Sequence, residues 1–123
     1  MIAADTSSLS AFLLGQGGKD VERLAEAVSA GQLVLPPVVV TEILSASESA
    51  ALAKPLLAVE TLELRDGYWH RAGTNRHLLR QKGLKAKVAD ALIAQSCIDH
   101  DVALITRDAD FRHFAEHCGL KLA

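Results

Sequence analysis

Short apolar segments that suit β-strands alternate along this chain with segments of helical periodicity, and this alternation constrains the fold more than any other feature. We expect strands over residues 2–5, 33–35, 59–64 and 103–106, with a last short strand over 120–122. We expect helices over residues 6–15, 19–30, 37–47, 67–82 and 88–98, and a last one that begins at Asp108 or Asp110 and ends at Gly119. The sequence therefore predicts an α/β domain with a central, mainly parallel β-sheet flanked by α-helices.

Three of these segments need a choice between alternatives. The valines at 38–40 favour a strand, but Pro36 and Pro37 suit the start of a helix and rarely lie inside a central strand, so we favour a helix. Asp66 is the expected cap of the helix that Gly83 ends. Residues 49–57 are predicted as a short helix or a loop. Eight of the eleven residues at 88–98 are apolar, so we expect that helix to be almost surrounded by protein.

The length of 123 residues predicts one domain over residues 1–123. No apolar run approaches the ~20 residues of a membrane span, and the N-terminal residues lack the basic region and apolar core of a secretory signal. Cys97 and Cys118 form no C-x-x-C pair, so we expect free or packed thiols. These features predict a cytoplasmic protein without a membrane partner.

Four acidic residues stand in otherwise apolar or small-residue segments: Asp5, Glu42, Asp90 and Asp108. A carboxylate in apolar surroundings is costly unless its charge is compensated, and a bound divalent cation would compensate it. Asp5 and Asp108 each follow a predicted strand, and sites in open parallel sheets form beyond the carboxyl ends of strands. Glu42 and Asp90 lie on helices that could face the same crevice. Carboxylates favour Mg²⁺ or Mn²⁺, which can drive phosphodiester hydrolysis.

Each acid also has a structural alternative. Asp5 and Asp108 could cap the helices that follow them, and Asp110 suits a cap better than a ligand. Glu42 and Asp90 lie inside predicted helices, where capping is unavailable to them, so exposure to water is their alternative.

A basic segment, residues 67–89, contains no Asp or Glu, although the whole chain has a formal net charge of −2. A one-sided basic segment is typical of a surface that binds a polyanion such as RNA, and a solvated helix face is the alternative. Its cationic residues are Arg71, Arg76, Arg80, Lys82, Lys85 and Lys87.

The acidic motifs, taken in order, resemble those of PIN-domain ribonucleases, specifically the VapC-like toxins of bacterial toxin–antitoxin pairs. The resemblance covers nearly the whole chain. The matching pieces are Asp5-Thr6-Ser7, Thr41-Glu42-Ile43-Leu44, Asp90-Ala91-Leu92-Ile93-Ala94 and the segment from Leu104 to Phe111.

The resemblance implies a metal-dependent endoribonuclease, a homodimer and a cognate antitoxin that inserts a peptide near the site. It implies that Asp5, Glu42, Asp90 and Asp108 bind the metal ion, Mg²⁺ or Mn²⁺, and that Thr106 supports the site by hydrogen bonding with help from Asp110. The alternative function is a non-catalytic PIN-like domain that binds a protein or RNA without cutting it.

Other signals are weaker. His113 and His117 match the H-x-x-E-H pattern of inverted zinc peptidases, but no third ligand is apparent. The glycines at 15, 17 and 18 form no nucleotide-phosphate motif, and a phosphoaspartate enzyme would need a second Asp near Asp5. Tyr68 and Trp69 are expected in the core rather than as base-stacking surfaces.

Overall fold

Parallel strands in the order β2–β1–β3 form the sheet, which confirms the predicted α/β architecture. The computed structural model describes residues 1–46 and 48–123, with only the backbone at residue 57. The strands are β1 (Ile2–Ala4), β2 (Leu33–Val34) and β3 (Ala103–Ile105). Ile2 of the central strand pairs with Leu33 on one side and with Ala103 on the other. The residues after β1 and β3 therefore meet at the same edge of the sheet.

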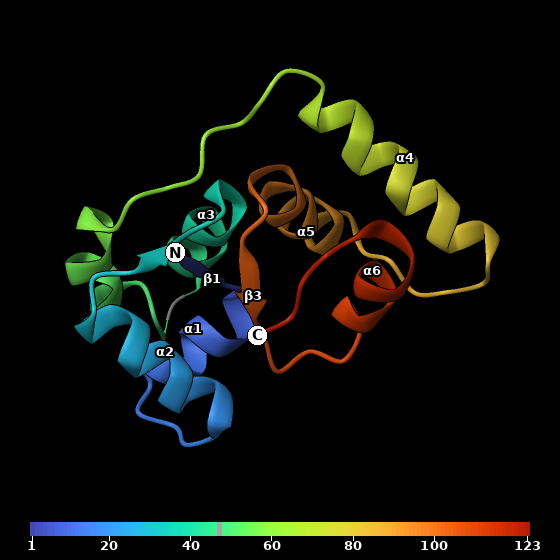
Figure 1. Cartoon of the computed structure of the whole chain (residues 1–123). Helices are drawn as coiled ribbons and strands as arrows, with labels where there is room; N and C mark the ends of the chain where they lie inside the picture. Colours follow the sequence, from blue (N-terminus) through green and yellow to red (C-terminus); the bar gives the residue numbers. More distant parts are fainter. Residues whose placement is uncertain (47) are drawn as a thin grey trace.

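Helices surround this narrow sheet (Figure 1). α5 packs against β3 and α4, so it lies between the sheet and α4, while α2 packs against β2 and β3. The helices are α1 (Thr6–Leu13), α2 (Lys19–Ser29), α3 (Pro37–Ser45), the 3₁₀-helix η1 (Ala51–Ala58), α4 (Tyr68–Gln81), α5 (Val88–His100) and α6 (Phe111–Cys118).

Local sequence signals explain several helix ends. Pro37 occupies the first turn of α3, where its missing N–H costs no hydrogen bond. Gly119 ends α6 with φ = 83°, a conformation that glycine adopts without steric cost. Asp5 caps α1, because its carboxylate accepts a hydrogen bond from the backbone N–H of Ser8.

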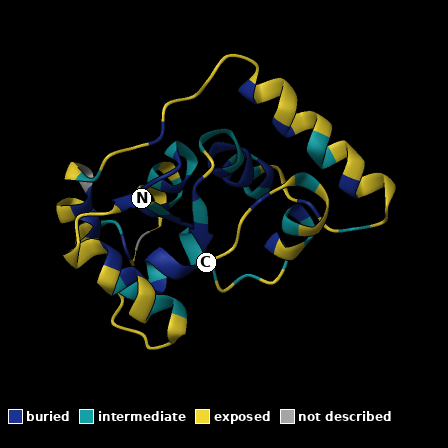
Figure 2. Cartoon of the chain, in the orientation of Figure 1, coloured by how far each residue is buried: buried dark blue, intermediate teal, exposed yellow. Residues whose placement is uncertain are grey.

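The core lies between the sheet and the helices, whose outer faces are exposed (Figure 2). As expected, α5 is largely enclosed: Ala91 and the five successive residues 93–97 are buried, including the polar Gln95. Gln95 is satisfied there, since its side chain accepts from Asn75 and donates to Asp99. The largest fully buried side chains include Tyr68, Phe111, Phe114, Leu9, Leu24 and Ile93.

Several expectations were wrong. Residues 59–64 do not form the expected strand. In the part of the chain that the structure describes, their only β-type pairing is an isolated parallel bridge between Thr61 and Leu35, the residue just after β2. Residues 120–122 likewise contribute only a bridge between Leu104 and Leu122. Asp66 does not cap α4; Gly67 precedes the helix with φ = 84°. The expected end of α3 at residue 47 lies outside the described residues, and α3 ends at Ser45.

Trp69 is also not a core residue, since 61% of it is exposed, whereas its neighbour Tyr68 is buried as expected. Consecutive residues on a helix point in different directions, so the Tyr68 side chain is buried against α5 while most of Trp69 is exposed to solvent. The Tyr68 hydroxyl donates a hydrogen bond to the carbonyl of Leu92, 2.6 Å away.

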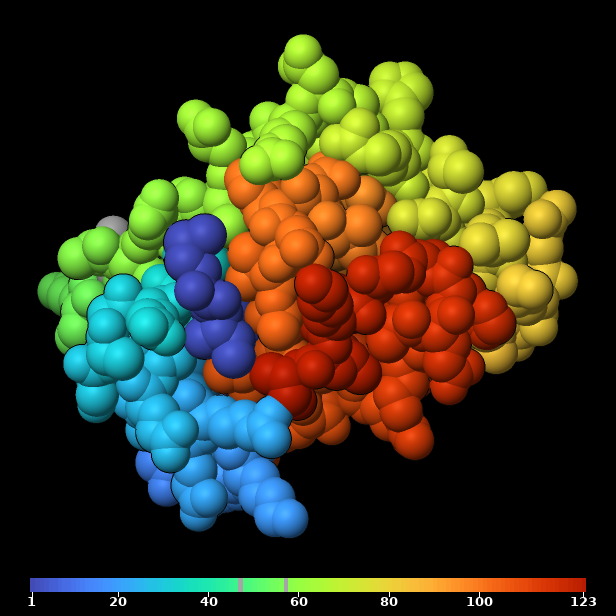
Figure 3. Space-filling model, viewed as in Figure 1, coloured from blue at the N-terminus to red at the C-terminus, as the bar shows by residue number. Residues whose placement is uncertain are grey.

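The N- and C-terminal segments lie on the same face of the molecule (Figure 3). Cys97 and Cys118 are free thiols, as expected, and burial raises the pKa of Cys97 to about 12. Among the described residues, no helix has the length and apolar character needed to cross a bilayer.

Candidate metal centre

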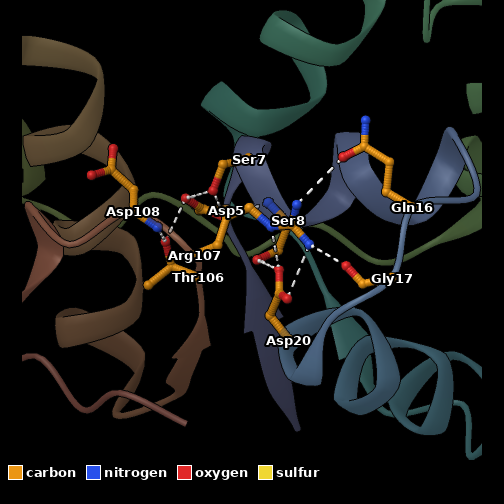
Figure 4. Close-up of polar contacts among 9 residues, drawn as sticks. All are labelled: Asp5, Ser7, Ser8, Gln16, Gly17, Asp20, Thr106, Arg107 and Asp108. Carbon is orange, nitrogen blue, oxygen red and sulfur yellow. Dashed lines mark hydrogen bonds and ion pairs between the residues drawn. The ribbon is translucent and has the colours of Figure 1, made fainter.

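Asp5 lies directly after the central strand and is 2% exposed. Its carboxylate accepts hydrogen bonds from the Ser8 backbone N–H at 2.9 Å, the Thr106 hydroxyl at 2.6 Å and the Ser7 hydroxyl at 2.8 Å (Figure 4). Burial raises the pKa of Asp5, these hydrogen bonds oppose the increase, and the charge of Asp108 adds to it. The capping alternative for Asp5 is thus correct, because its Oδ1 caps α1. The Ser7 and Thr106 hydroxyls hold its Oδ2, so the whole carboxylate is fixed at the strand end.

Asp90, Asp108 and Asp110 form a cluster in which one oxygen of each lies within 4.8 Å of the others. Asp108 follows β3, and its Oδ1 accepts a hydrogen bond from the Asp110 N–H at 2.9 Å. The side chain of Asp110 makes no capping hydrogen bond to α6, so the capping interpretation of Asp110 was wrong. Its carboxylate instead faces the other two acids.

Asp90 carries the clearest sign of an incomplete site. Its Oδ2 is buried, and no group in the described part of the chain hydrogen-bonds to it. Burial raises the pKa of Asp90 to about 6, helped by the charge of Asp108 and, to a smaller extent, by Asp5 and Glu42, while Lys87 opposes the shift. Four carboxylates therefore influence one another across this region.

Glu42 lies on α3 and accepts a hydrogen bond from the Thr6 hydroxyl at 2.6 Å. Asp5 and Glu42 stand outside the 4.8 Å cluster, although both charges act on Asp90. We call Asp5, Glu42, Asp90, Asp108 and Asp110 together the acidic centre.

Thr106 links the two strand ends. Its hydroxyl donates to Asp5 and accepts from the Asp108 N–H at 3.0 Å. The residues that sequence reasoning missed are Ser7 and Ser8 as partners of Asp5, and Asp20, whose carboxylate accepts from the Ser8 hydroxyl at 2.8 Å. The hydroxyl-rich run after Asp5 signalled the serines, but no sequence feature signalled Asp20.

The donor set fits a hard divalent cation. Such ions prefer carboxylate oxygens, and the three clustered acids offer these in one place with an unpartnered buried oxygen among them. Asp90, Asp108 and Asp110 are the residues whose oxygens lie together closely enough to hold the ion, while Asp5 and Glu42 act on Asp90 through their charges. The same described residues offer no cluster of three ligands that contains His113 or His117, which gives the zinc alternative no support.

The cationic residues of the basic segment differ in the partners that they contact within the protein. Arg71 makes a two-pronged ion pair with Asp99, and Arg76 donates to the carbonyl of Ala86 at 2.8 Å. Lys85 lies 3.7 Å from Asp110, which connects the segment to the acidic centre. The exposed remainder is Arg80, Lys82 and Lys87.

Comparison with known proteins shows the same fold in solved structures. Among them, three crystal structures match over nearly the whole chain. VapBC2 from Rickettsia felis, bound to a DNA fragment from their promoter, has a TM-score of 0.77 at 19% identity and covers 100% of this chain and 98% of that chain. FitAcB from Neisseria gonorrhoeae has a TM-score of 0.71 at 18% identity, with 99% and 96% covered. DNA-bound VapBC from Salmonella typhimurium has a TM-score of 0.72 at 16% identity, with 100% and 98% covered.

At these identities the likeness shows the shared fold. A search of curated protein sequences gave no significant match. The family model described as "PIN domain" matches residues 2–117, which include the whole acidic centre. This chain, with its strand-end carboxylates on a parallel sheet, belongs to the PIN domain family.

Proposed function

We propose that this protein is a metal-dependent endoribonuclease and acts as the toxin of a toxin–antitoxin pair. The observation that carries the proposal is the cluster of Asp90, Asp108 and Asp110, with the Asp90 Oδ2 buried and unpartnered by the described residues. The PIN family membership and the similarity to VapBC structures support it.

In this proposal Asp5, Glu42, Asp90 and Asp108 hold Mg²⁺ or Mn²⁺, and Asp110 joins them because its oxygen lies in the cluster. The bound ion would lower the pKa of a coordinated water and offset the charge of the scissile phosphate. Thr106 keeps Asp5 turned toward the β3 end through its short hydrogen bond. Without an ion, the carboxylates would repel the RNA phosphates, so the same residues exclude substrate from the metal-free protein.

RNA would reach the acidic centre along the basic segment. Lys85 lies beside Asp110 and Lys87 lies close enough to Asp90 to lower its pKa, so cations border the site at one side. Arg80 and Lys82, exposed at the end of α4, extend this border and can contact the phosphate backbone without reading sequence. We assign Arg71 and Arg76 a smaller part, because both are engaged within the protein.

We also propose a cognate antitoxin and a homodimer. The antitoxin is proposed from the likeness to VapBC structures and from the need to restrain a nuclease in the cell that makes it. The homodimer is proposed only from the resemblance to VapC-like toxins. Toxicity on expression alone, relieved by co-expression of a neighbouring short reading frame, is the expected result for the antitoxin. Light scattering of the purified chain tests the dimer.

The central experiment incubates the purified protein with a broad RNA pool and Mn²⁺, then maps the new 5′ ends. We expect discrete cuts that EDTA abolishes and that Asp90→Asn lacks. Binding without new ends would instead support the non-catalytic module. EDTA-resistant cutting, or full cutting by Asp90→Asn, would contradict the proposed mechanism.

A further inference from the structure

A closed ring of contacts surrounds the strand ends beside the acidic centre. The Arg107 guanidinium reaches from the loop between β3 and α6 to Asp20 on α2, with Nε 2.8 Å from Oδ2 and Nη2 3.1 Å from Oδ1. Asp20 accepts from the Ser8 hydroxyl, and the Ser8 N–H donates to Asp5. Asp5 accepts from Thr106, which precedes Arg107 in the chain. The ring therefore joins segments that are 87 and 101 residues apart.

The turn between α1 and α2 is shaped to receive Arg107 (Figure 4). Nη2 also donates to the Gly17 carbonyl at 3.1 Å, and Nη1 lies 3.4 Å from the Gln16 Oε1. At Gly18, which has φ = 142°, a Cβ would lie 2.6 Å from Asp20 Oδ1 and 3.0 Å from Arg107 Nη2. Glycine at this position thus leaves the space in which the ion pair forms.

Arg107 and Asp108 leave the same loop in opposite directions (Figure 4). Arg107 points to α2, and Asp108 points to the carboxylate cluster. Fixing Arg107 therefore fixes the backbone that carries Thr106 on one side and Asp108 on the other. The planar guanidinium suits this role, since two parallel hydrogen bonds to a carboxylate define an orientation as well as a distance.

We propose that the Arg107–Asp20 ion pair is a positioning device for the metal centre, holding Thr106 and Asp108 in register with Asp5. This inference rests on the proposed function, because it assumes that the acidic centre binds a divalent ion. Arg107 touches neither the ion nor the substrate; it acts through the loop. Residues that orient metal ligands commonly change metal affinity by about 10–100-fold when removed.

The test measures Mn²⁺ affinity by calorimetry or by electron paramagnetic resonance, together with Tm. Removing a cation near a metal site would by electrostatics alone strengthen Mn²⁺ binding, whereas losing the positioning contact weakens it. The sign of the change in Arg107→Ala therefore separates the two effects. We expect binding about tenfold weaker or worse.

A second ion pair provides a matched control. Asp99 on α5 forms a similar two-pronged ion pair with Arg71 on α4, and neither residue belongs to the ring of contacts around the strand ends. Asp20→Asn and Asp99→Asn each remove one carboxylate charge from such a pair. We expect Asp20→Asn to weaken Mn²⁺ binding about tenfold and Asp99→Asn to change it less than about twofold, with similar losses in Tm.

Arg107→Lys keeps the charge but loses the fork, and we expect it to bind Mn²⁺ about threefold more weakly than the unmodified chain. If Arg107→Ala does not fold, the Mn²⁺ affinity of Arg107→Lys tests the positioning role instead. Unchanged or tighter binding in Arg107→Ala, or unchanged binding in Arg107→Lys, would overturn the positioning role and leave the proposed function intact. Failure of the unmodified chain to bind Mn²⁺ would overturn both.

Discussion

Asp5 and Lys82 differ sharply in how firmly the protein holds them. Asp5 is buried at a strand end, and three residues donate hydrogen bonds to its carboxylate. Lys82 is exposed just after α4, and no ion-pair partner occurs for it in the described ranges. The same contrast separates the acidic centre from the outer part of the basic segment. Metal ligands need fixed geometry, while contacts to a flexible phosphate chain tolerate long mobile side chains.

The largest expected effect comes from changing the acidic centre itself. Asp108→Asn should lower Mn²⁺-dependent RNA cleavage by at least about a hundredfold, because several kcal/mol of metal-assisted stabilisation would be lost. Lys82→Ala should lower the rate of Mn²⁺-dependent RNA cleavage by less than about tenfold, and a single-turnover cleavage assay measures both variants.

The control for this comparison is Asp101→Asn, which changes an exposed aspartate that pairs with Lys121. Asparagine also tolerates the positive φ of 54° at this position. Equal losses in Asp108→Asn and Lys82→Ala would contradict the distinction between a constrained centre and a loosely held border.

The second prediction concerns pH and the metal-free protein. Burial raises the pKa of Asp90 from the ordinary aspartate value of 3.8 to about 6, so between these two pH values the folded state holds a proton that the unfolded chain has lost. Stability contributed by this group therefore falls as the pH rises from about 4 to above 6, by at most about 3 kcal/mol.

Urea unfolding in EDTA checks this effect. The free energy of unfolding of Asp90→Asn minus that of the unmodified chain should be larger at pH 7.5 than at pH 4, so the variant becomes relatively more stable as the pH rises. The comparison between the two chains removes the contribution of Asp5, whose pKa is also raised by burial. The same difference at both pH values would show that Asp90 is not destabilised by its surroundings.

The third prediction tests the link between strand ends. Thr106→Val removes a donor to Asp5 and an acceptor for the Asp108 N–H while keeping a β-branched shape. We expect a loss of about 1–3 kcal/mol in the free energy of unfolding, because a buried carboxylate loses a partner. Thr61→Val, at an exposed position, is the matched control and should change stability by less than about 0.5 kcal/mol. Indistinguishable values for the two variants would rule out a structural contribution from this hydroxyl.

The smallest effects are expected in the basic segment. Arg80→Ala or Lys82→Ala should weaken RNA binding a few-fold, and each should reduce the slope of log K against log salt by about 1. Arg71→Ala should leave that slope unchanged, because Asp99 already neutralises its guanidinium. Fluorescence anisotropy at several salt concentrations measures both quantities. A slope change in Arg71→Ala as large as that in Arg80→Ala would place the RNA path along a different face.

Sequence reasoning predicted the fold class and most helices because apolar periodicity and turn residues are local signals. It failed at residues 59–64, where alternation was present but the available partner was a two-residue strand. It also misjudged Trp69, since the direction of an α4 side chain depends on which face meets α5.

At the acidic centre, isolated carboxylates in apolar segments were visible in the sequence, and the structure brings their charges into range of one another. For Asp110 the resemblance implied only help to the site, because an aspartate at a helix start suits a cap better than a ligand, whereas its oxygen lies in the cluster. Asp20 and Arg107 carried no local signal at all, since a contact across 87 residues has no periodicity.

The central position of β1 also sets when the acidic centre can exist during protein synthesis. Asp5 is made before the other acids, but Thr106, its hydroxyl partner just after the neighbouring strand β3, is 101 residues further along the chain. Asp108 and Asp110 are added later still. A growing chain therefore carries scattered carboxylates without a binding site until β3 and the loop after it have been made. A truncated product that stops before β3 never forms the acidic centre.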